Sequence, residues 1–227
     1  MTFLTRSIAR FVVVASLLAC ASALAGGNDF FDLRRIEPLH GDANVGKEKA
    51  AVCSACHGAA GVSPAAMFPN LAGQHAEYLY WQLVVFKREA RPESPMTSQI
   101  ENLDDATMRD LAAWFASLPP APSSPATDAS SRGAKLYREG DPAHGTPPCQ
   151  GCHGADARGN PLAADNASYR LYPALRGQHA DYVVQRLKEF RDGKHLSSSS
   201  GRIMTPVART LDDESIAAVA AWLQSAP

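Results

Sequence analysis

The sequence predicts an all-α protein built from two copies of one small helical domain. Apolar residues recur at helical spacing in both halves, and clear alternating patterns of the kind that form β-strands are missing. The halves also repeat each other: FPNLAGQHAEY at 68–78 matches YPALRGQHADY at 172–182, and LDDATMRDLAAWF at 103–115 matches LDDESIAAVAAWL at 211–223. Each half has roughly 80–95 residues, a size at which a domain usually needs an extra cross-link or a cofactor.

The N-terminus predicts a secretory signal peptide at 1–25. Basic residues precede the apolar run FVVVASLLA at 11–19, which is too short to span a bilayer, and small residues lead to a cleavage site before Gly26. The alternative is a lipoprotein signal, since LLAC at 17–20 resembles a lipobox and would leave a lipidated Cys20 as the first mature residue. Both signals predict export. We therefore expect a periplasmic protein, with membrane association through its partners or through a lipidated Cys20.

A stretch rich in proline and serine divides the remaining chain. PPAPSSPATDASS at 119–131 has no apolar periodicity and predicts an extended linker between a first domain at 38–118 and a second at 132–227. The offset between the repeats grows along the second half, from 96 residues at the cysteines to 108 at the last helix. This growth predicts two insertions, both in loop-like sequence, around RGNPLAADNAS and KHLSSSSGR.

Two amphipathic helices are predicted in each half from residues at i, i+3 or i+4, and i+7. Their apolar faces are Leu79, Leu83 and Phe86, matched by Val183, Leu187 and Phe190, and Met108, Leu111 and Phe115, matched by Ile216, Val219 and Leu223. Asp104 and Asp212 stand just before the second helix of each half. We expect both carboxylates to act as N-caps.

Each half contains one CxxCH motif, formed by Cys53, Cys56 and His57 and by Cys149, Cys152 and His153. Two thiols at this spacing can each add to a vinyl group of one haem, and the histidine that follows can bind the iron. A redox disulfide is disfavoured because the strand and helix context of a thioredoxin-like site is missing. A zinc site of four sulfurs is not excluded by spacing alone. Because each pair has its own adjacent histidine in an exported chain, we expect two covalently attached haems c.

Matched methionines are the candidates for the sixth iron ligand. Met96 and Met204 each lie seven residues before the LDD of the last helix in their half. Met67 and Met108 have no methionine counterparts, so we expect them to fill the core. The repeated histidines His75 and His179 lie at the start of a helix, where a surface position is the main expectation and ligation of the iron the alternative. The unmatched His40, His144 and His195 are expected to face solvent.

At these motifs the sequence resembles the dihaem cytochrome c4 family. The resemblance rests on GKEKAAVCSACHG at 46–58, FPNLAGQ at 68–74, PM at 95–96 and GAKLYREGDP with PPCQGCHG in the second half. It implies two class I cytochrome c folds, each wrapped round one haem with His and Met ligands. It also implies that the carbonyls of Pro69 and Pro173 accept a hydrogen bond from the axial histidines, and that Leu71 and Leu175 pack on the haems.

A dedicated electron carrier is the predicted function, because an iron whose axial positions are both filled has no place for a substrate. We expect electrons to come from a quinol-oxidising or dehydrogenase system and to leave to a terminal oxidase or reductase. The alternatives are a dihaem subunit of a larger dehydrogenase complex, a dihaem peroxidase and a haem-based sensor, the last two requiring a haem with an open position.

The two halves differ in net charge, and the charges of the whole chain argue against nucleic acid as a partner. With 22 Lys and Arg against 23 Asp and Glu and no long basic run, a nucleic-acid surface is not supported. Residues 26–119 carry a formal charge of −4 and residues 132–227 carry +2. The molecule should be dipolar, which would orient it on approach to a charged redox protein. The alternative is two solvated surfaces without a steering role.

Overall fold

The computed structural model describes residues 30–33, 36–88, 94–123 and 130–226. The chain divides into two compact units, Met1–Phe31 and Asp32–Pro227, and only Phe30 and Phe31 of the first are described. The predicted signal peptide and Cys20 lie outside the described residues. Among the residues described, no helix combines the length and the apolar character needed to cross a membrane. Both predicted domains, 38–118 and 132–227, fall within the second unit, and the boundary between them stays a prediction.

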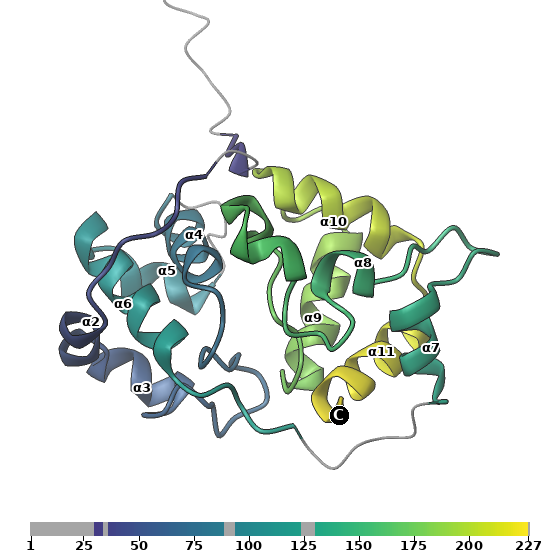
Figure 1. Cartoon of the computed structure of the whole chain (residues 1–227), viewed down its shortest axis with the longest axis horizontal. Coiled ribbons are helices and arrows are strands. Elements are labelled where there is room, and N and C mark those ends of the chain that lie inside the picture. The colour runs from purple at the N-terminus through teal and green to yellow at the C-terminus, as the bar shows by residue number, and fades with distance from the viewer. Residues whose placement is uncertain (1–29, 34–35, 89–93, 124–129, 227) are drawn as a thin grey trace, which may run out of the picture. The chain divides into compact units, whose positions relative to one another are not determined.

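The second unit is helical, as predicted, and its helices follow the internal repeat (Figure 1). The first half forms α2 (Ala43–Lys49), α3 (Ala51–His57), α4 (Ala76–Lys87), α5 (Pro95–Ile100) and α6 (Asp105–Ser117). The second half forms α7 (Arg132–Glu139), α8 (Gln150–His153), α9 (Ala180–Arg191), α10 (Ser199–Arg209) and α11 (Asp213–Ser225). Within the described ranges no β-strand forms, although an isolated bridge joins Asp141 and Thr146.

The first and last helices of each half cross closely at a glycine. α2 packs on α6, and α7 packs on α11. A Cβ on Gly46 would overlap the carbonyl oxygen of Asp110, and a Cβ on Gly133 would overlap that of Ala218. Since a side chain at either position would push the helices apart, the two glycines fix the same crossing in both halves.

The apolar faces predicted for the last helices form the centre of each half. Met108, Leu111 and Phe115 of α6 are buried, and so are Ile216, Val219 and Leu223 of α11. α4 packs on α6 and α9 packs on α11. Leu79, Phe86 and Val183 on these helices are buried, whereas Leu83, Leu187 and Phe190 are half-buried.

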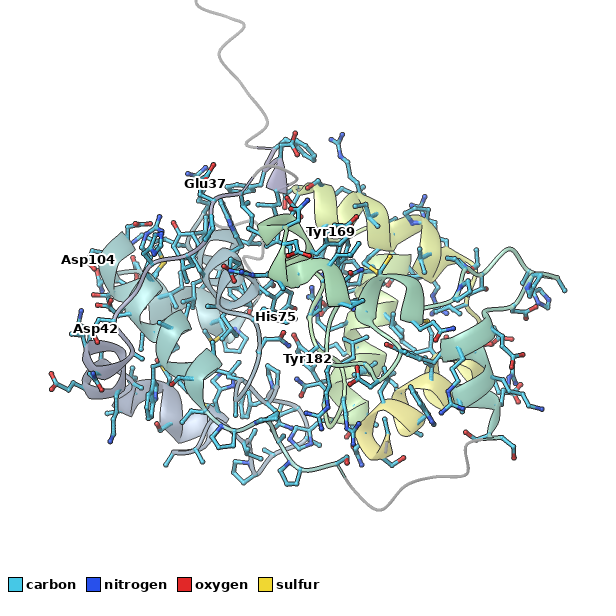
Figure 2. All side chains as sticks on the ribbon, viewed as in Figure 1. Glu37, Asp42, His75, Asp104, Tyr169 and Tyr182 are labelled. Carbon is cyan, nitrogen blue, oxygen red and sulfur yellow. The ribbon has the colours of Figure 1, made fainter. Side chains whose placement is uncertain are left out.

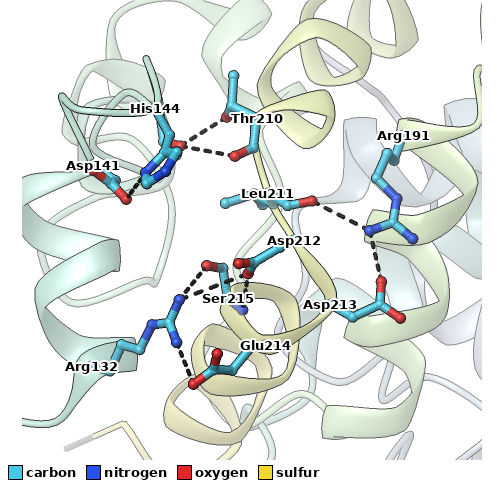
Figure 3. Close-up of polar contacts among 11 residues, drawn as sticks. Arg132, Asp141, His144, Arg191, Thr210, Leu211, Asp212, Asp213, Glu214 and Ser215 are labelled. Carbon is cyan, nitrogen blue, oxygen red and sulfur yellow. Dashed lines mark hydrogen bonds and ion pairs between the residues drawn. The ribbon is translucent and has the colours of Figure 1, made fainter.

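Both predicted N-caps are present. The Asp104 carboxylate accepts a hydrogen bond from the Thr107 backbone N–H at 2.7 Å, and the Asp212 carboxylate accepts one from that of Ser215 at 2.7 Å (Figure 3). In the second half, Arg132 of α7 also lies 3.7 Å from Asp212 and 2.5 Å from Glu214. The start of α11 is therefore tied to α7 by charge as well as by packing.

The two insertions of the second half are partly helical rather than loops. The first contains the 3₁₀ helix η2 (Pro161–Ala164) and the start of a second, η3 (Ala167–Leu171), and each helix is begun by an asparagine side chain that accepts a backbone N–H. The second supplies the first turn of α10, where Ser198 is the N-cap. η3 packs against α4 of the first half. The first insertion is thus part of the contact between the halves.

The start of the predicted linker is packed on both halves. A Cβ on Gly73 would lie 2.8 Å from the Cα atom of Pro120, and a Cβ on Gly177 would lie 2.9 Å from the Ala121 carbonyl oxygen. Only its first residues, 119–123, and its last two are described. The chain therefore leaves the first half along a surface that both repeats build.

Candidate haem sites

The CxxCH residues lie on one short helix in each half. Cys53, Cys56 and His57 belong to α3, and Cys149 is the N-cap of α8, which contains Cys152 and His153. Positions i and i+3 share one helix face, so both thiols of a pair point to the same side. All four cysteines are free, and Cys53 and Cys149 are half-buried while Cys56 and Cys152 are exposed. A disulfide within either pair is not formed.

Burial keeps the inner thiol of each pair protonated. It raises the pKa of the Cys53 thiol, and it raises that of Cys149 to about 11. A thiol with such a pKa is a poor thiolate nucleophile at neutral pH. The inner thiol is therefore unsuited to thiol–disulfide exchange, and its inward position suits a bond to a buried group.

Each motif histidine is oriented by one backbone carbonyl. The Nδ1–H of His57 donates to the Pro69 carbonyl at 2.9 Å, and the Nδ1–H of His153 donates to the Pro173 carbonyl at 2.9 Å. Both side chains are buried, and this burial lowers the pKa of both imidazoles. The rings are thus neutral with the proton on Nδ1, which leaves Nε2 as the nitrogen that can bind a metal.

The leucines that follow these prolines belong to the same loops. The N–H groups of Leu71 and Leu175 donate to the carbonyls of Gly61 and Ala157, both at 2.8 Å. Leu175 also packs against the apolar core of the second half. Contact of the two leucines with haem stays a prediction.

The two methionines occupy different parts of their helices. Met96 is the second residue of α5, two positions after the N-cap Ser94, whereas Met204 lies in the middle of the longer α10. The second insertion accounts for this difference because it adds helix before Met204. Both side chains are half-buried. Their role as iron ligands stays a prediction.

The zinc alternative is not supported by the arrangement of the side chains. No cluster of three or more His, Cys, Asp or Glu side chains that could hold a metal ion occurs in the part of the chain that the structure describes. Two cysteine pairs that came together would form such a cluster. Two thiols and one neutral imidazole in each half instead fit one covalently bound haem, whose iron needs only the imidazole from this set.

Aromatic side chains next to the histidines were missed from the sequence. The Phe68 ring meets the His57 ring edge to face with centroids 6.2 Å apart, and Tyr172 meets His153 in the same way at 6.3 Å. Phe68 and Tyr172 are the first residues of the FPNL and YPAL repeats, so the repeat itself was the available signal. They add a second restraint on each imidazole plane.

The repeated GQH histidines are not surface residues, and their side chains do not cap their helices. His75 and His179 are half-buried N-cap residues without a side-chain capping bond. The Nε2–H of His179 donates to the Ser63 carbonyl at 3.1 Å. The ring of His75, labelled in Figure 2, lies against Gly159, where a Cβ would overlap the Nε2 atom of the histidine. Each histidine therefore contacts the opposite half, directly after that half's CxxCH helix.

Two other expectations were wrong, while three were right. His195 is largely shielded, with 11% of its side chain exposed, because its Nε2 atom lies 2.8 Å from the Glu189 carboxylate and 2.8 Å from the Arg186 guanidinium. Met67 is 66% exposed and does not fill the core. As expected, Met108 is buried and both His40 and His144 are exposed.

These features define a class of protein, the c-type cytochromes with two haem-binding units. The family model described as Cytochrome c matches residues 44–119 and 130–227, so each half is matched separately. The two matched regions contain one CxxCH motif each. The chain accordingly carries two covalently attached haems c.

Similarity to individual proteins narrows the class. The chain is 39% identical over 193 residues to cytochrome c4 of Azotobacter vinelandii, which covers 81% of this chain and 89% of that protein. It is also 37% identical over 184 residues to a thiosulfate dehydrogenase electron acceptor of Thiomonas intermedia, covering 79% and 80%. The crystal structure of reduced cytochrome c4 from Pseudomonas stutzeri superposes with a TM-score of 0.71 at 37% identity, over 83% of this chain and all of that chain. The protein belongs to the cytochrome c4 family and is an electron carrier, not an enzyme.

Proposed function

We propose that the protein carries single electrons in the periplasm, with His57 and Met96 as axial ligands of one haem iron and His153 and Met204 as those of the other. The observation that carries this proposal is the pair of buried, neutral imidazoles, each oriented by a proline carbonyl and each next to two free thiols. When bound, each haem supplies an iron that cycles between two oxidation states. The chain supplies the thioether bonds, the two axial ligands and a shielded pocket.

Methionine ligation is what separates a carrier from an enzyme in this proposal. A thioether favours the reduced iron and so raises the reduction potential, and it closes the position where peroxide or carbon monoxide would bind. With both sixth positions closed, the peroxidase and sensor alternatives lose their open site. The proposed chemistry is then electron transfer at the haem edge alone.

The visible spectrum of the oxidised holoprotein tests the ligands. A methionine–iron bond gives a weak long-wavelength band, and we expect its full strength for two haems per chain. Met96→Ala and Met204→Ala should each remove half of the band, whereas Met67→Ala, at an exposed methionine, should leave it unchanged. A half-strength band in the unsubstituted protein, peroxide turnover or carbon monoxide binding would instead indicate an open haem.

Two kinds of electron donor are supported by different observations. One candidate donor is the quinol-oxidising system expected from the sequence, with a terminal oxidase or reductase as acceptor. Similarity to a thiosulfate dehydrogenase electron acceptor supports a dehydrogenase donor, either as a free partner or in a stable complex. Mixing the oxidised protein with thiosulfate and its dehydrogenase, or with quinol and a quinol-oxidising complex, compares the two reduction rates directly.

Periplasmic location rests on the signal predicted at 1–25. The intact mass of the mature holoprotein tests this prediction, because cleavage before Gly26 and lipidation of Cys20 give different masses. Retention of the full N-terminus in the mature protein would contradict both forms of export.

A further inference from the structure

The glutamine of each GQH motif extends its side chain to the backbone of the opposite half. The amide of Gln74 in the first half accepts from the Ala174 N–H at 2.9 Å and donates to the Ala174 carbonyl at 2.8 Å. The amide of Gln178 in the second half accepts from the Asn70 N–H at 2.9 Å and donates to the Asn70 carbonyl at 3.0 Å. Both glutamines are 7% exposed. Each therefore holds one backbone residue of the opposite half through two buried hydrogen bonds.

The residue that is held comes directly after the proline that orients the opposite motif histidine. The Asn70 N–H and the Pro69 carbonyl are the two polar groups of one planar peptide unit. Gln178 accepts a hydrogen bond from the N–H end of this unit, while His57 donates one to the oxygen end. The peptide between Pro173 and Ala174 is bonded in the same way by Gln74 and His153.

Hydrogen bonds at the two ends of one peptide strengthen each other. An acceptor at the N–H polarises the peptide, which makes its carbonyl oxygen a better acceptor for the histidine. A stronger bond from Nδ1–H makes the imidazole a more basic ligand, which favours the oxidised iron. Removal of the glutamine should therefore loosen the histidine and raise the potential of the haem in the opposite half.

We propose that Gln74 and Gln178 are reciprocal positioning residues, so that each haem's histidine, and with it that haem's reduction potential, depends on a side chain from the other half. The inference rests on the proposed axial role of His57 and His153. It explains why GQH repeats in both halves although neither motif contributes a residue to the CxxCH site of its own half.

We call the two pairs of hydrogen bonds, from Gln74 to Ala174 and from Gln178 to Asn70, the glutamine clamps. They differ in one respect, and this difference predicts which haem depends more on its clamp. The Asn70 side chain adds its own bonds, because it donates to the Gly177 carbonyl at 2.9 Å and accepts from the Ser63 N–H at 2.8 Å. Ala174 has no such side chain. Loss of Gln74 should therefore disturb the second haem more than loss of Gln178 disturbs the first.

Hydrogen exchange in the reduced holoprotein tests the clamps residue by residue. Gln74→Met keeps the side-chain volume but removes both hydrogen bonds to Ala174, together with the one that Gln74 accepts from the His75 N–H at 3.0 Å. It should speed exchange of the Ala174 amide and of the His153 ring N–H about five- to tenfold, the factor expected for one buried hydrogen bond. Exchange of the Asn70 amide and of the His57 ring N–H should stay unchanged. Gln178→Met should give the reverse pattern with a smaller factor.

The same ring N–H signals can assign the potentials. During a redox titration, each signal should disappear when its own haem is oxidised. In Gln74→Met, the haem of the second half should keep its electron to a higher applied potential, with at least a roughly threefold change in its oxidised-to-reduced ratio, where tenfold corresponds to about 59 mV. If the ring N–H signals of the unsubstituted protein did not change on oxidation, His57 and His153 would not be axial ligands. This outcome would be seen before any glutamine is changed.

Two further variants separate positioning from loss of packing. Gln74→Glu keeps an acceptor for the Ala174 N–H and should restore slow exchange of the His153 ring N–H. Arg170→Gln breaks the ion pair that Arg170 makes with Glu77 across the halves at 2.7 Å, together with its bond to the Ala163 carbonyl, but it leaves the hydrogen bonds of both glutamines in place. It should therefore leave exchange of the Asn70 and Ala174 amides unchanged. Equal changes at both histidines in Gln74→Met, or changes confined to His57, would overturn the proposal.

Discussion

Gly159 shows how a single residue in one half accommodates a side chain from the other. Its φ of +112° is a backbone conformation that favours glycine, and the His75 ring occupies the space where a Cβ would lie. The corresponding residue of the first half is Val62, and His179 bonds to the carbonyl of the next residue, Ser63. The pseudo-symmetric contacts are therefore not interchangeable, although both come from GQH.

Three glycine variants should separate the effect of backbone strain from that of steric overlap with the His75 ring. Gly145 has φ +74° with no atom near a Cβ, and Gly151 has a helical backbone and the same free space. We expect Gly145→Ala to lower the free energy of unfolding by roughly 1–2 kcal/mol through strain alone, and Gly159→Ala to lower it further. Gly151→Ala, which restores the alanine found at the matching Ala55, should cost nothing. Denaturant unfolding of the holoproteins gives the order, and equal effects at Gly159 and Gly145 would show that His75 simply moves aside.

At the scale of the elements, the N-terminus of α11 combines a cap with an ion pair. Hydrogen bonds from Ser215, and then the charge of Arg132, lower the pKa of the Asp212 carboxyl (Figure 3). Because the folded-state pKa is the lower one, the stabilisation is complete above the ordinary carboxyl pKa of about 3.9 and disappears as the pH falls through the folded-state pKa.

Substitution of Asp212 by asparagine or alanine should separate the contribution of the N-cap hydrogen bond to stability from that of the carboxylate charge. Asp212→Asn keeps an N-cap acceptor, so it should remain close to the parent at acid pH, with a smaller stability above pH 4 because the ion pair is gone. Asp212→Ala should be less stable than both at neutral pH, since the cap is lost too. Thermal unfolding of the holoproteins between about pH 3 and 7 checks these curves. A parent and an asparagine variant that lose stability in parallel on acidification would contradict the assigned role of the charge.

At the scale of the whole molecule, the halves differ in charge and are joined by asymmetric contacts. Residues 26–119 carry 8 basic against 12 acidic side chains, and residues 132–227 carry 12 against 10. The contact between halves includes Arg170 of η3, which bonds to the buried Glu77 of α4. Arg170, which follows the first insertion, thus supplies a cation where the matching residue of the first half is Ala66.

This charge distribution predicts opposite salt dependences at the two haems. A small cationic oxidant should react faster with the first half at low salt and lose this advantage between about 0.01 and 0.15 M ionic strength, where the screening length falls from roughly 30 to 8 Å. An anionic oxidant should show the reverse preference. Stopped-flow oxidation of the reduced holoprotein with both reagents gives the slopes. Rates that do not change with salt for either reagent would rule out steering.

The local features of this protein were determined by the sequence alone. The two amphipathic helices of each half and the paired N-caps at Asp104 and Asp212 follow from periodicity and capping over a few neighbouring residues. The repeat then transferred each assignment from one half to the other. These interactions involve short chain separations, so a linear pattern contains them.

The partners of the repeated motifs were decided only by the tertiary structure. Gln74 and Ala174 are 100 residues apart, Asn70 and Gln178 are 108 apart, and no local pattern relates them. The shielding of His195, the exposure of Met67 and the packing of η3 on α4 also depend on which surfaces meet. A repeat predicts that the two halves have the same fold. It does not predict the contact between them, because that contact depends on residues that differ between the two copies.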